Sequence, residues 1–178
     1  MVVLRATQRV LRRLPPGRQE VADSETALGD WYVNRLIVAR QPLLLLLSSR
    51  SFLAVLTPAR DIRLLPAQFP GLVADRLHRL EIPTALVQAE VAAMDPVLTA
   101  PTRDRSVLGI LVDFTRSIPY YLARSGWDGA GLRRAVDQLA GTPCHASRRA
   151  DEVVFPDAVA PKLLKDRWQI GLGRAHSG

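Results

Sequence analysis

Arginine side chains are the groups of this chain best suited to bind an anion, and the candidates are Arg35, Arg103, Arg105 and Arg116. Arg103 and Arg105 flank Asp104 at the predicted start of a helix, where free backbone N–H groups create positive potential. A phosphate or carboxylate would be attracted to such a place. The alternative is that Asp104 caps the helix and the arginines face water or pair with neighbouring acids.

A second set of residues could perform acid–base chemistry on a phosphodiester. Asp30, Asp113 and Tyr120 carry groups that can move protons, and Arg105 could stabilise the charge of a phosphate transition state. This combination would suit a small metal-independent ribonuclease of the kind found in toxin systems. The ribonuclease is the alternative hypothesis. The lack of a diagnostic catalytic motif favours a non-enzymatic role.

Cysteine and histidine residues are too few and too scattered to form a metal site. Cys144 and His145 are adjacent, so in an extended segment their side chains point to opposite faces, and His78 and His176 lie elsewhere in the chain. The sequence therefore predicts no metal and no cofactor. Cys144 is expected to be a small buried hydrophobic residue rather than a nucleophile.

The overall charge is the main indication of a partner. The formal net charge is +7, and nearly all of the positive charge is arginine, with lysine only at Lys162 and Lys165. Clustered cations attract polyanions and release counterions from phosphates. An arginine-rich composition can also arise without selection for nucleic acid, in which case the charge carries no function.

The leading functional hypothesis is a non-enzymatic binding or regulatory module whose partner is nucleic acid or a nucleic-acid-associated protein. It rests on the basic charge and on the lack of a metal cluster, phosphate loop or nucleophile motif. Trp31, Tyr32, Tyr120 and Tyr121 could offer stacking faces to bases. A structural protein that docks another chain through an exposed apolar patch is a further interpretation.

With 178 residues the chain suits one domain, which we expect to span residues 1–170, followed by a flexible tail at 171–178. A single cysteine permits no intrachain disulfide, and the first residues lack the pattern of a secretory signal. Together these features predict a cytoplasmic protein. The leucine run at 43–47 is too short to span a membrane, so it is expected to form a buried strand.

The elements that would position the candidate residues follow from the spacing of apolar side chains. Alternation and short apolar runs predict strands at 2–4, 31–40, 43–47, 52–56 and 87–91. Helical spacing predicts helices after Thr7, over 69–80, from Thr102 or Asp104 to 122, around 132–139 and around 159–168. Pro70 is expected in a first turn, and Pro119 is expected to kink or break the longest helix.

These elements predict an α+β fold, with a single domain that contains an antiparallel sheet of about five strands and helices packed mainly on one face. The leucine strand is apolar on both sides, so it should lie centrally in the sheet. Its second face would be covered by the C-terminal segment or by a second copy of the chain. The sequence thus also predicts a homodimer.

Three segments together resemble a known family. They are 5–11 (RATQRVL), 28–34 (LGDWYVN) and 105–109 (RSVLG), the last followed by Asp113 and Phe114. In this order they are similar to a family of small bacterial proteins of uncharacterised function, over roughly residues 2–145. The resemblance implies an α+β fold with a small sheet. It implies no reaction, cofactor or catalytic residue.

Overall fold

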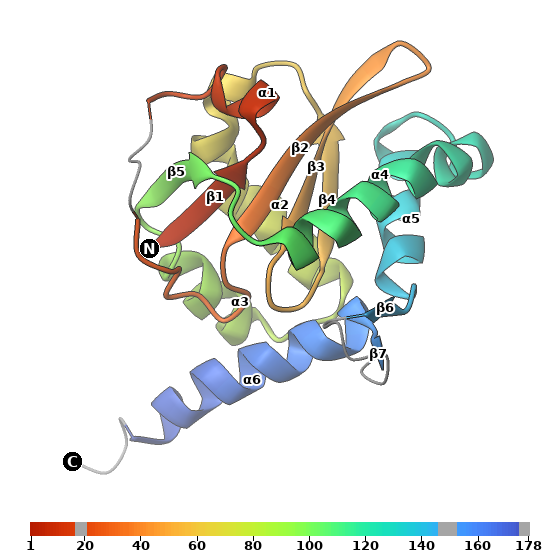
Figure 1. Ribbon diagram of the computed structural model, residues 1–178. Coiled ribbons are helices and arrows are strands. Elements are labelled where there is room, and N and C mark those ends of the chain that lie inside the picture. Colours follow the sequence, from red (N-terminus) through yellow and green to blue (C-terminus); the bar gives the residue numbers. More distant parts are fainter. Residues whose placement is uncertain (17–20, 146–152, 175–178) are drawn as a thin grey trace.

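The structure is a computed structural model, and it describes residues 1–16, 21–145 and 153–174. Its centre is a five-stranded sheet with the strand order β4-β3-β2-β1-β5 (Figure 1). The strands are β1 (Val2–Ala6), β2 (Trp31–Val38), β3 (Gln41–Ser48), β4 (Ala54–Pro58) and β5 (Val97–Pro101). The α+β fold with a five-stranded sheet that the sequence predicted is confirmed.

The sheet is mixed rather than wholly antiparallel. β2, β3 and β4 form the antiparallel meander that the short connections predicted. β1, in contrast, runs parallel to both of its neighbours, β2 and β5. A tight turn cannot join two parallel strands, and helical segments separate β1 from β2 and β4 from β5 along the chain. The difference from the predicted sheet therefore lies in the strands with long connections.

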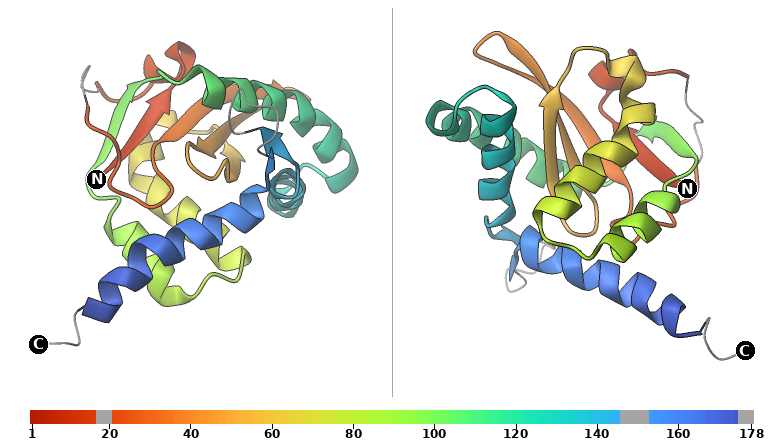
Figure 2. Two further views of the ribbon diagram at one scale, coloured as in Figure 1. Left: turned by 60° about the horizontal axis from the view of Figure 1, so that its bottom comes forward. Right: turned by 180° about the vertical axis from the view of Figure 1, so that it is seen from behind.

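Helices cover both faces of the sheet (Figure 2). On one side lie α1 (Gln8–Leu11), the 3₁₀ helix η1 (Ile62–Leu64), α2 (Leu65–Arg79), α3 (Thr84–Ala92) and α6 (Pro156–Arg174). On the other side lie α4 (Arg105–Ser125) and α5 (Gly129–Ala140). The sequence predicted helices mainly on one face. The second face is occupied because α4 and α5 also carry apolar stripes that must be buried.

The leucine strand β3 is covered on both faces, as its composition predicted. Leu44 and Leu46 pack on the α2 side, whereas Leu43, Leu45 and Leu47 pack on the α4 side. β3 lies beside β2, which is the middle strand of the sheet. The homodimer was expected because a second copy of the chain could cover one face of this strand. Helices of the same chain cover both faces instead, so this argument for a dimer is lost, and dimerisation stays a prediction.

One segment forms a different kind of element from the one that the sequence predicts. The alternation at residues 87–91 predicts a strand, but these residues belong to α3, and the fifth strand is β5. Alternation over five residues is weak evidence, because Leu86, Val87 and Glu90 also fit helical spacing and are the buried residues of α3. Pairing with β1, which is distant in the sequence, decides that residues 97–101 form the strand.

The start of α4 agrees with the sequence prediction. Asp104 is the N-cap, and its carboxylate accepts hydrogen bonds from the backbone N–H groups of Ser106 (2.8 Å) and Val107 (3.3 Å). Pro119 lies inside the helix, which continues past it, so of the two predicted effects the break does not occur and the kink stays a prediction. α2 also contains a proline in its interior, Pro70, because that helix begins about one turn earlier than predicted.

The C-terminal part adds a two-stranded sheet and α6. β6 (Cys144–His145) pairs antiparallel with β7 (Val153–Val154). α6 reaches residue 174, so residues 171–174 of the predicted tail are helical, and residues 175–178 lie outside the described residues. None of the helices in the described ranges is long and apolar enough to cross a membrane.

A buried carboxylate joins α3 to α6 and to the loop before β2. Glu90 is fully buried, and it accepts hydrogen bonds of 2.8–3.0 Å from the backbone N–H groups of Ala27 and Leu28 and from the indole N–H of Trp168. Burial raises the pKa of Glu90 above its usual range, although the three donors act in the opposite direction. Three segments of the chain are thus held by one acidic group.

We predict that Glu90 makes the protein less stable as the pH rises. Because its pKa is raised in the folded state, the folded protein keeps the proton at pH values where the unfolded chain has released it. The free energy of unfolding should fall as the pH rises above 4.5, the ordinary pKa of this group, and level off above the folded pKa. Urea unfolding of the wild type and of Glu90→Gln, from about pH 4 to about pH 7, measures this difference. An equal pH dependence of the two proteins would contradict the prediction.

Candidate functional site

Two of the four arginines singled out from the sequence are engaged by acids. Arg103 is paired with Asp23, and its guanidinium lies 3.4 Å from a carboxylate oxygen of Asp30. The hydrogen bond from Arg103 holds the pKa of Asp23 below its usual range. Arg116 lies 3.6 Å from Asp113, one turn earlier on α4, and both side chains are exposed. Each of these arginines already has a counter-ion, which reduces the positive charge it offers to a ligand.

The residues of the ribonuclease alternative are spread over the molecule. Arg105 and Tyr120 are separated by four turns of α4, which corresponds to about 22 Å along the helix axis. Asp113 is exposed between them. Asp30 is buried at the start of β2, where it contacts other partners. The structure therefore does not bring these four side chains together around one phosphate.

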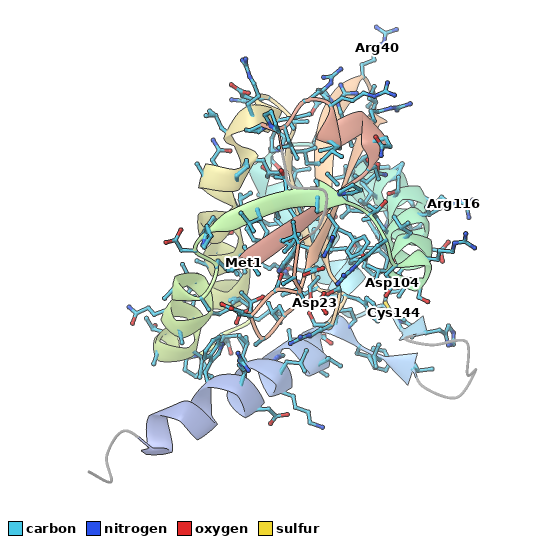
Figure 3. The ribbon with its side chains drawn as sticks, turned by 60° about the vertical axis from the view of Figure 1, so that its left-hand side comes forward. Met1, Asp23, Arg40, Asp104, Arg116 and Cys144 are labelled. Carbon is cyan, nitrogen blue, oxygen red and sulfur yellow. The ribbon has the colours of Figure 1, made fainter. Side chains whose placement is uncertain are left out.

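The structure instead gathers polar side chains around Asp30, in a cavity of about 150 Å³ between the loop before β2, the β3–β4 turn and the start of α4. One carboxylate oxygen of Asp30 accepts hydrogen bonds from the backbone N–H (3.0 Å) and the hydroxyl (2.6 Å) of Ser24. The other accepts a hydrogen bond of 2.8 Å from Arg5. Asp23 and Asp104, labelled in Figure 3, both line this cavity.

The same cavity connects β2 to α4. The hydroxyl oxygen of Tyr32 accepts a hydrogen bond of 3.0 Å from the backbone N–H of Asp104, and burial raises the pKa of Tyr32. Gly29 has a φ of 76°, and a Cβ at this position would lie 2.6 Å from the hydroxyl oxygen of Ser49. In segment 28–34, the backbone conformation requires Gly29, the carboxylate of Asp30 accepts the hydrogen bonds from Ser24 and Arg5, and the hydroxyl of Tyr32 accepts the hydrogen bond from Asp104. The carboxylates here are paired with arginines or backbone N–H groups, so the cavity is best described as a network that positions β1, β2 and α4.

The structure buries Cys144, as expected from the sequence. Cys144 is 5% exposed, and burial raises the pKa of its thiol to about 11. A thiol with such a pKa is protonated at neutral pH and is therefore a poor nucleophile. His145 is its exposed neighbour in β6. Within the described ranges, no group of three His, Cys, Asp or Glu side chains is placed to hold a metal ion.

A larger cavity opens at the opposite end of the sheet, between α1 and the segment that links β4 to η1. Its volume is about 710 Å³, which is typical of small-ligand sites, and it is lined by Arg12, Arg13, Arg60 and Arg63. Asp61 is the one acid in the described lining, and it lies 3.4 Å from Arg63. The other three arginines have no acidic partner within ion-pair distance among the described residues.

Further arginines extend this cavity into a basic surface. Arg60 also lies beside Pro42 of the β2–β3 hairpin, whose turn carries Arg40. Figure 3 shows Arg40 at the upper end of the molecule, away from Asp23 and Asp104. We call the arginines at this end of the molecule the arginine surface. They come from α1 and the two residues after it, from β2, from the hairpin turn, from the β4–η1 link and from η1. Its members are Arg9, Arg12, Arg13, Arg35, Arg40, Arg60 and Arg63.

Of the arginine surface, the sequence analysis had singled out only Arg35, which is partly exposed on β2. The adjacent pair Arg12 and Arg13 and the close pair Arg60 and Arg63 were available as local signals, since both stand beside predicted ends of elements. Their convergence was not visible, because the two pairs are far apart in the sequence. The packing of α1 and η1 on the same side of the sheet brings them together.

A family model matches residues 3–159 of the chain, and it is described as Domain of unknown function (DUF6933). Comparison with curated proteins finds no match, and comparison with solved structures finds none either. The matched range contains both the cavity around Asp30 and the arginine surface. The function must therefore be argued from the residues of this chain.

Proposed function

The chain belongs to the family Domain of unknown function (DUF6933), and we propose that it is a non-enzymatic module that binds nucleic acid through the arginine surface. The distribution of charge supports this proposal. Four of the seven arginines of the arginine surface line one cavity, and Asp61 is the one acid in the described part of that lining. Elsewhere among the described residues, aspartate partners are found for Arg5, Arg76, Arg79, Arg103 and Arg116. Other described arginines outside the surface also have no acidic partner within ion-pair distance, so what supports the proposal is the convergence of arginines on one cavity. They are Arg50, Arg105, Arg124, Arg133, Arg134 and Arg167.

Exposed arginines that have no acidic partner among the described residues, such as Arg12, Arg13 and Arg60, suit a phosphate backbone for two reasons. The guanidinium group is always charged, and its planar set of donors can hold two phosphate oxygens at once. Nucleic acid also releases condensed counterions when its phosphates are neutralised, which favours binding at low salt. A cluster of such arginines therefore fits a polyanion better than it fits a neutral ligand.

A binding role is favoured over a reaction by the composition of the cavity. Its described lining holds arginine, leucine, proline, alanine, isoleucine and one aspartate, and contains no histidine, cysteine or tyrosine. The aspartate is already close to Arg63. Asp61 is the one group of the described lining that could act as a general base, and a second proton-transferring group would have to come from elsewhere, whereas phosphate binding needs only the arginines that are present.

The proposal is tested by measuring the binding of the purified, nuclease-free protein to single- and double-stranded DNA and RNA across a salt series. We expect the logarithm of the association constant to fall linearly with the logarithm of the salt concentration, with a slope of about −3 to −6, because each neutralised phosphate contributes about −0.7 to −0.9. The probes should stay intact. Cleaved probes would instead support the ribonuclease, and no binding at about 50 mM salt would show that the arginine content has no such role.

A further inference from the structure

The hairpin between β2 and β3 projects beyond the neighbouring helices at the arginine surface (Figure 1, Figure 2). Its two turn residues, Ala39 and Arg40, have φ values of 46° and 65°. Positive φ at both central positions is the geometry of a type I′ turn, which asparagine and glycine adopt far more readily. The chain therefore places a guanidinium at the tip of the hairpin although a smaller residue would suit the backbone better.

Apolar side chains stand next to this arginine. Ile37 is 60% exposed, and it lies opposite Pro42 in the antiparallel ladder. Directly opposed residues share one face of a hairpin, and alternate residues of a strand point the same way, so Arg35 lies on this face as well. The tip of the hairpin is thus a narrow two-stranded ribbon that combines an exposed apolar pair with arginines.

The arginine surface is poorly suited to single strands. Proteins that bind single-stranded nucleic acid stack the bases on exposed aromatic rings. The described lining of the arginine cavity contains no aromatic residue. Trp127 lines the adjoining cavity together with Arg60 and Pro42, but its side chain is partly buried and does not offer a fully exposed ring. The exposed aromatic side chains among the described residues, Tyr120 and Phe155, lie on α4 and just before α6. Recognition of phosphates without base stacking favours a duplex, in which the bases are already stacked on one another.

The shape of the hairpin discriminates between duplexes. The major groove of B-form DNA is about 12 Å wide and admits a two-stranded ribbon, whereas the major groove of A-form RNA is deep and too narrow for side chains to read. An apolar pair at the tip would contact base edges such as the thymine methyl group, and arginine is the commonest partner of guanine in that groove. These features match the composition of residues 37–42.

We propose that the partner is B-form double-stranded DNA, with hairpin residues 37–42 entering the major groove while the arginine cavity contacts the flanking phosphates. This inference rests on the proposed function and specifies the class of nucleic acid. Both parts of the contact lie at the same end of the molecule, since Arg60 lies beside both the cavity and the hairpin. A single duplex could therefore reach both.

The test compares one sequence as duplex DNA, single-stranded DNA and duplex RNA, by fluorescence anisotropy at about 0.1 M salt, with the wild type and two hairpin variants. Arg40→Gly removes the guanidinium but suits the turn, so weaker binding could not be attributed to misfolding. Ala39→Gly is the matched control, because it relieves the same turn and keeps Arg40. We expect duplex DNA to bind at least about tenfold more tightly than the other two probes, and Arg40→Gly alone to lose about tenfold in affinity for it.

Methylation of guanine N7, which lies in the major groove, supplies a second readout. The bound wild-type protein should protect this atom within the site, and Arg40→Gly should protect it less. Equal binding of the three probes, unchanged binding by Arg40→Gly, or unprotected N7 would overturn the hairpin inference and leave the proposed function standing. No binding of any probe at about 50 mM salt would overturn both.

Discussion

Replacing Asp30 with alanine is expected to lower the free energy of unfolding by about 3–5 kcal/mol. Asp30 and Arg5 form an ion pair of 2.8 Å whose side chains are 6% and 4% exposed. Without the carboxylate, the Arg5 guanidinium would remain buried with no opposite charge, and its Nη2 atom has no hydrogen-bond partner among the described residues even now. The variant also removes the acceptor for the N–H and hydroxyl groups of Ser24.

Urea unfolding of three variants would measure this effect. Asp113→Ala is the matched control, because Asp113 also faces an arginine but both partners are exposed, and a change within about 0.5 kcal/mol is expected. The double variant Arg5→Met/Asp30→Ala removes both buried charges and should recover part of the lost stability. A loss below about 1 kcal/mol for Asp30→Ala would show that the pair is not the structural link between β1, β2 and the loop before β2.

Reversing the charge of three cavity arginines should weaken nucleic-acid binding by roughly 10² to 10³-fold at about 0.1 M salt. The variant is Arg12→Glu/Arg13→Glu/Arg60→Glu, in which all three side chains are exposed around one cavity. Each lost phosphate contact should also reduce the steepness of the salt dependence by about one. Binding to all sequences should weaken alike, because phosphate contacts carry no sequence information.

A second triple variant separates the cavity from the net charge of +7. Arg116→Glu/Lys162→Glu/Lys165→Glu makes the same change in net charge at exposed positions on α4 and α6. α6 lies at the end of the molecule away from α1 and the hairpin (Figure 1). We expect this variant to lose less than about tenfold in affinity, since only long-range attraction is reduced. Equal losses in the two triple variants would mean that overall charge, and not the arginine surface, drives binding.

The local parts of the fold could be read from the sequence. Asp104 caps α4 by accepting hydrogen bonds from backbone N–H groups two and three residues later in the chain. The meander of β2, β3 and β4 requires only apolar runs that are joined by short turns. The strand predicted at 87–91 is part of α3, and the fifth strand is β5, because the choice depends on pairing with β1, which lies far away in the chain. A short segment of alternating residues fits both elements until that partner is known.

The candidate site shows the same division between local and long-range information. Sequence reasoning selected arginines near motifs, and Arg103 and Arg116 proved to be neutralised by Asp23 and Asp113. Whether an arginine is free for a ligand depends on the acids that the fold places beside it. The sequence shows which residues are charged, but it does not show which charged residues lie side by side in the folded protein.

By itself, the sequence determined that this protein has a buried leucine strand within an α+β core, a basic character dominated by arginine, and a membership in a family of unknown function. Only the tertiary structure decided that Arg12 and Arg13 of one segment meet Arg60 and Arg63 of another around a cavity. Periodicity and capping act over a few residues, so they are visible in the chain. The convergence of charges is set by the packing of distant helices on one sheet, which no local pattern encodes.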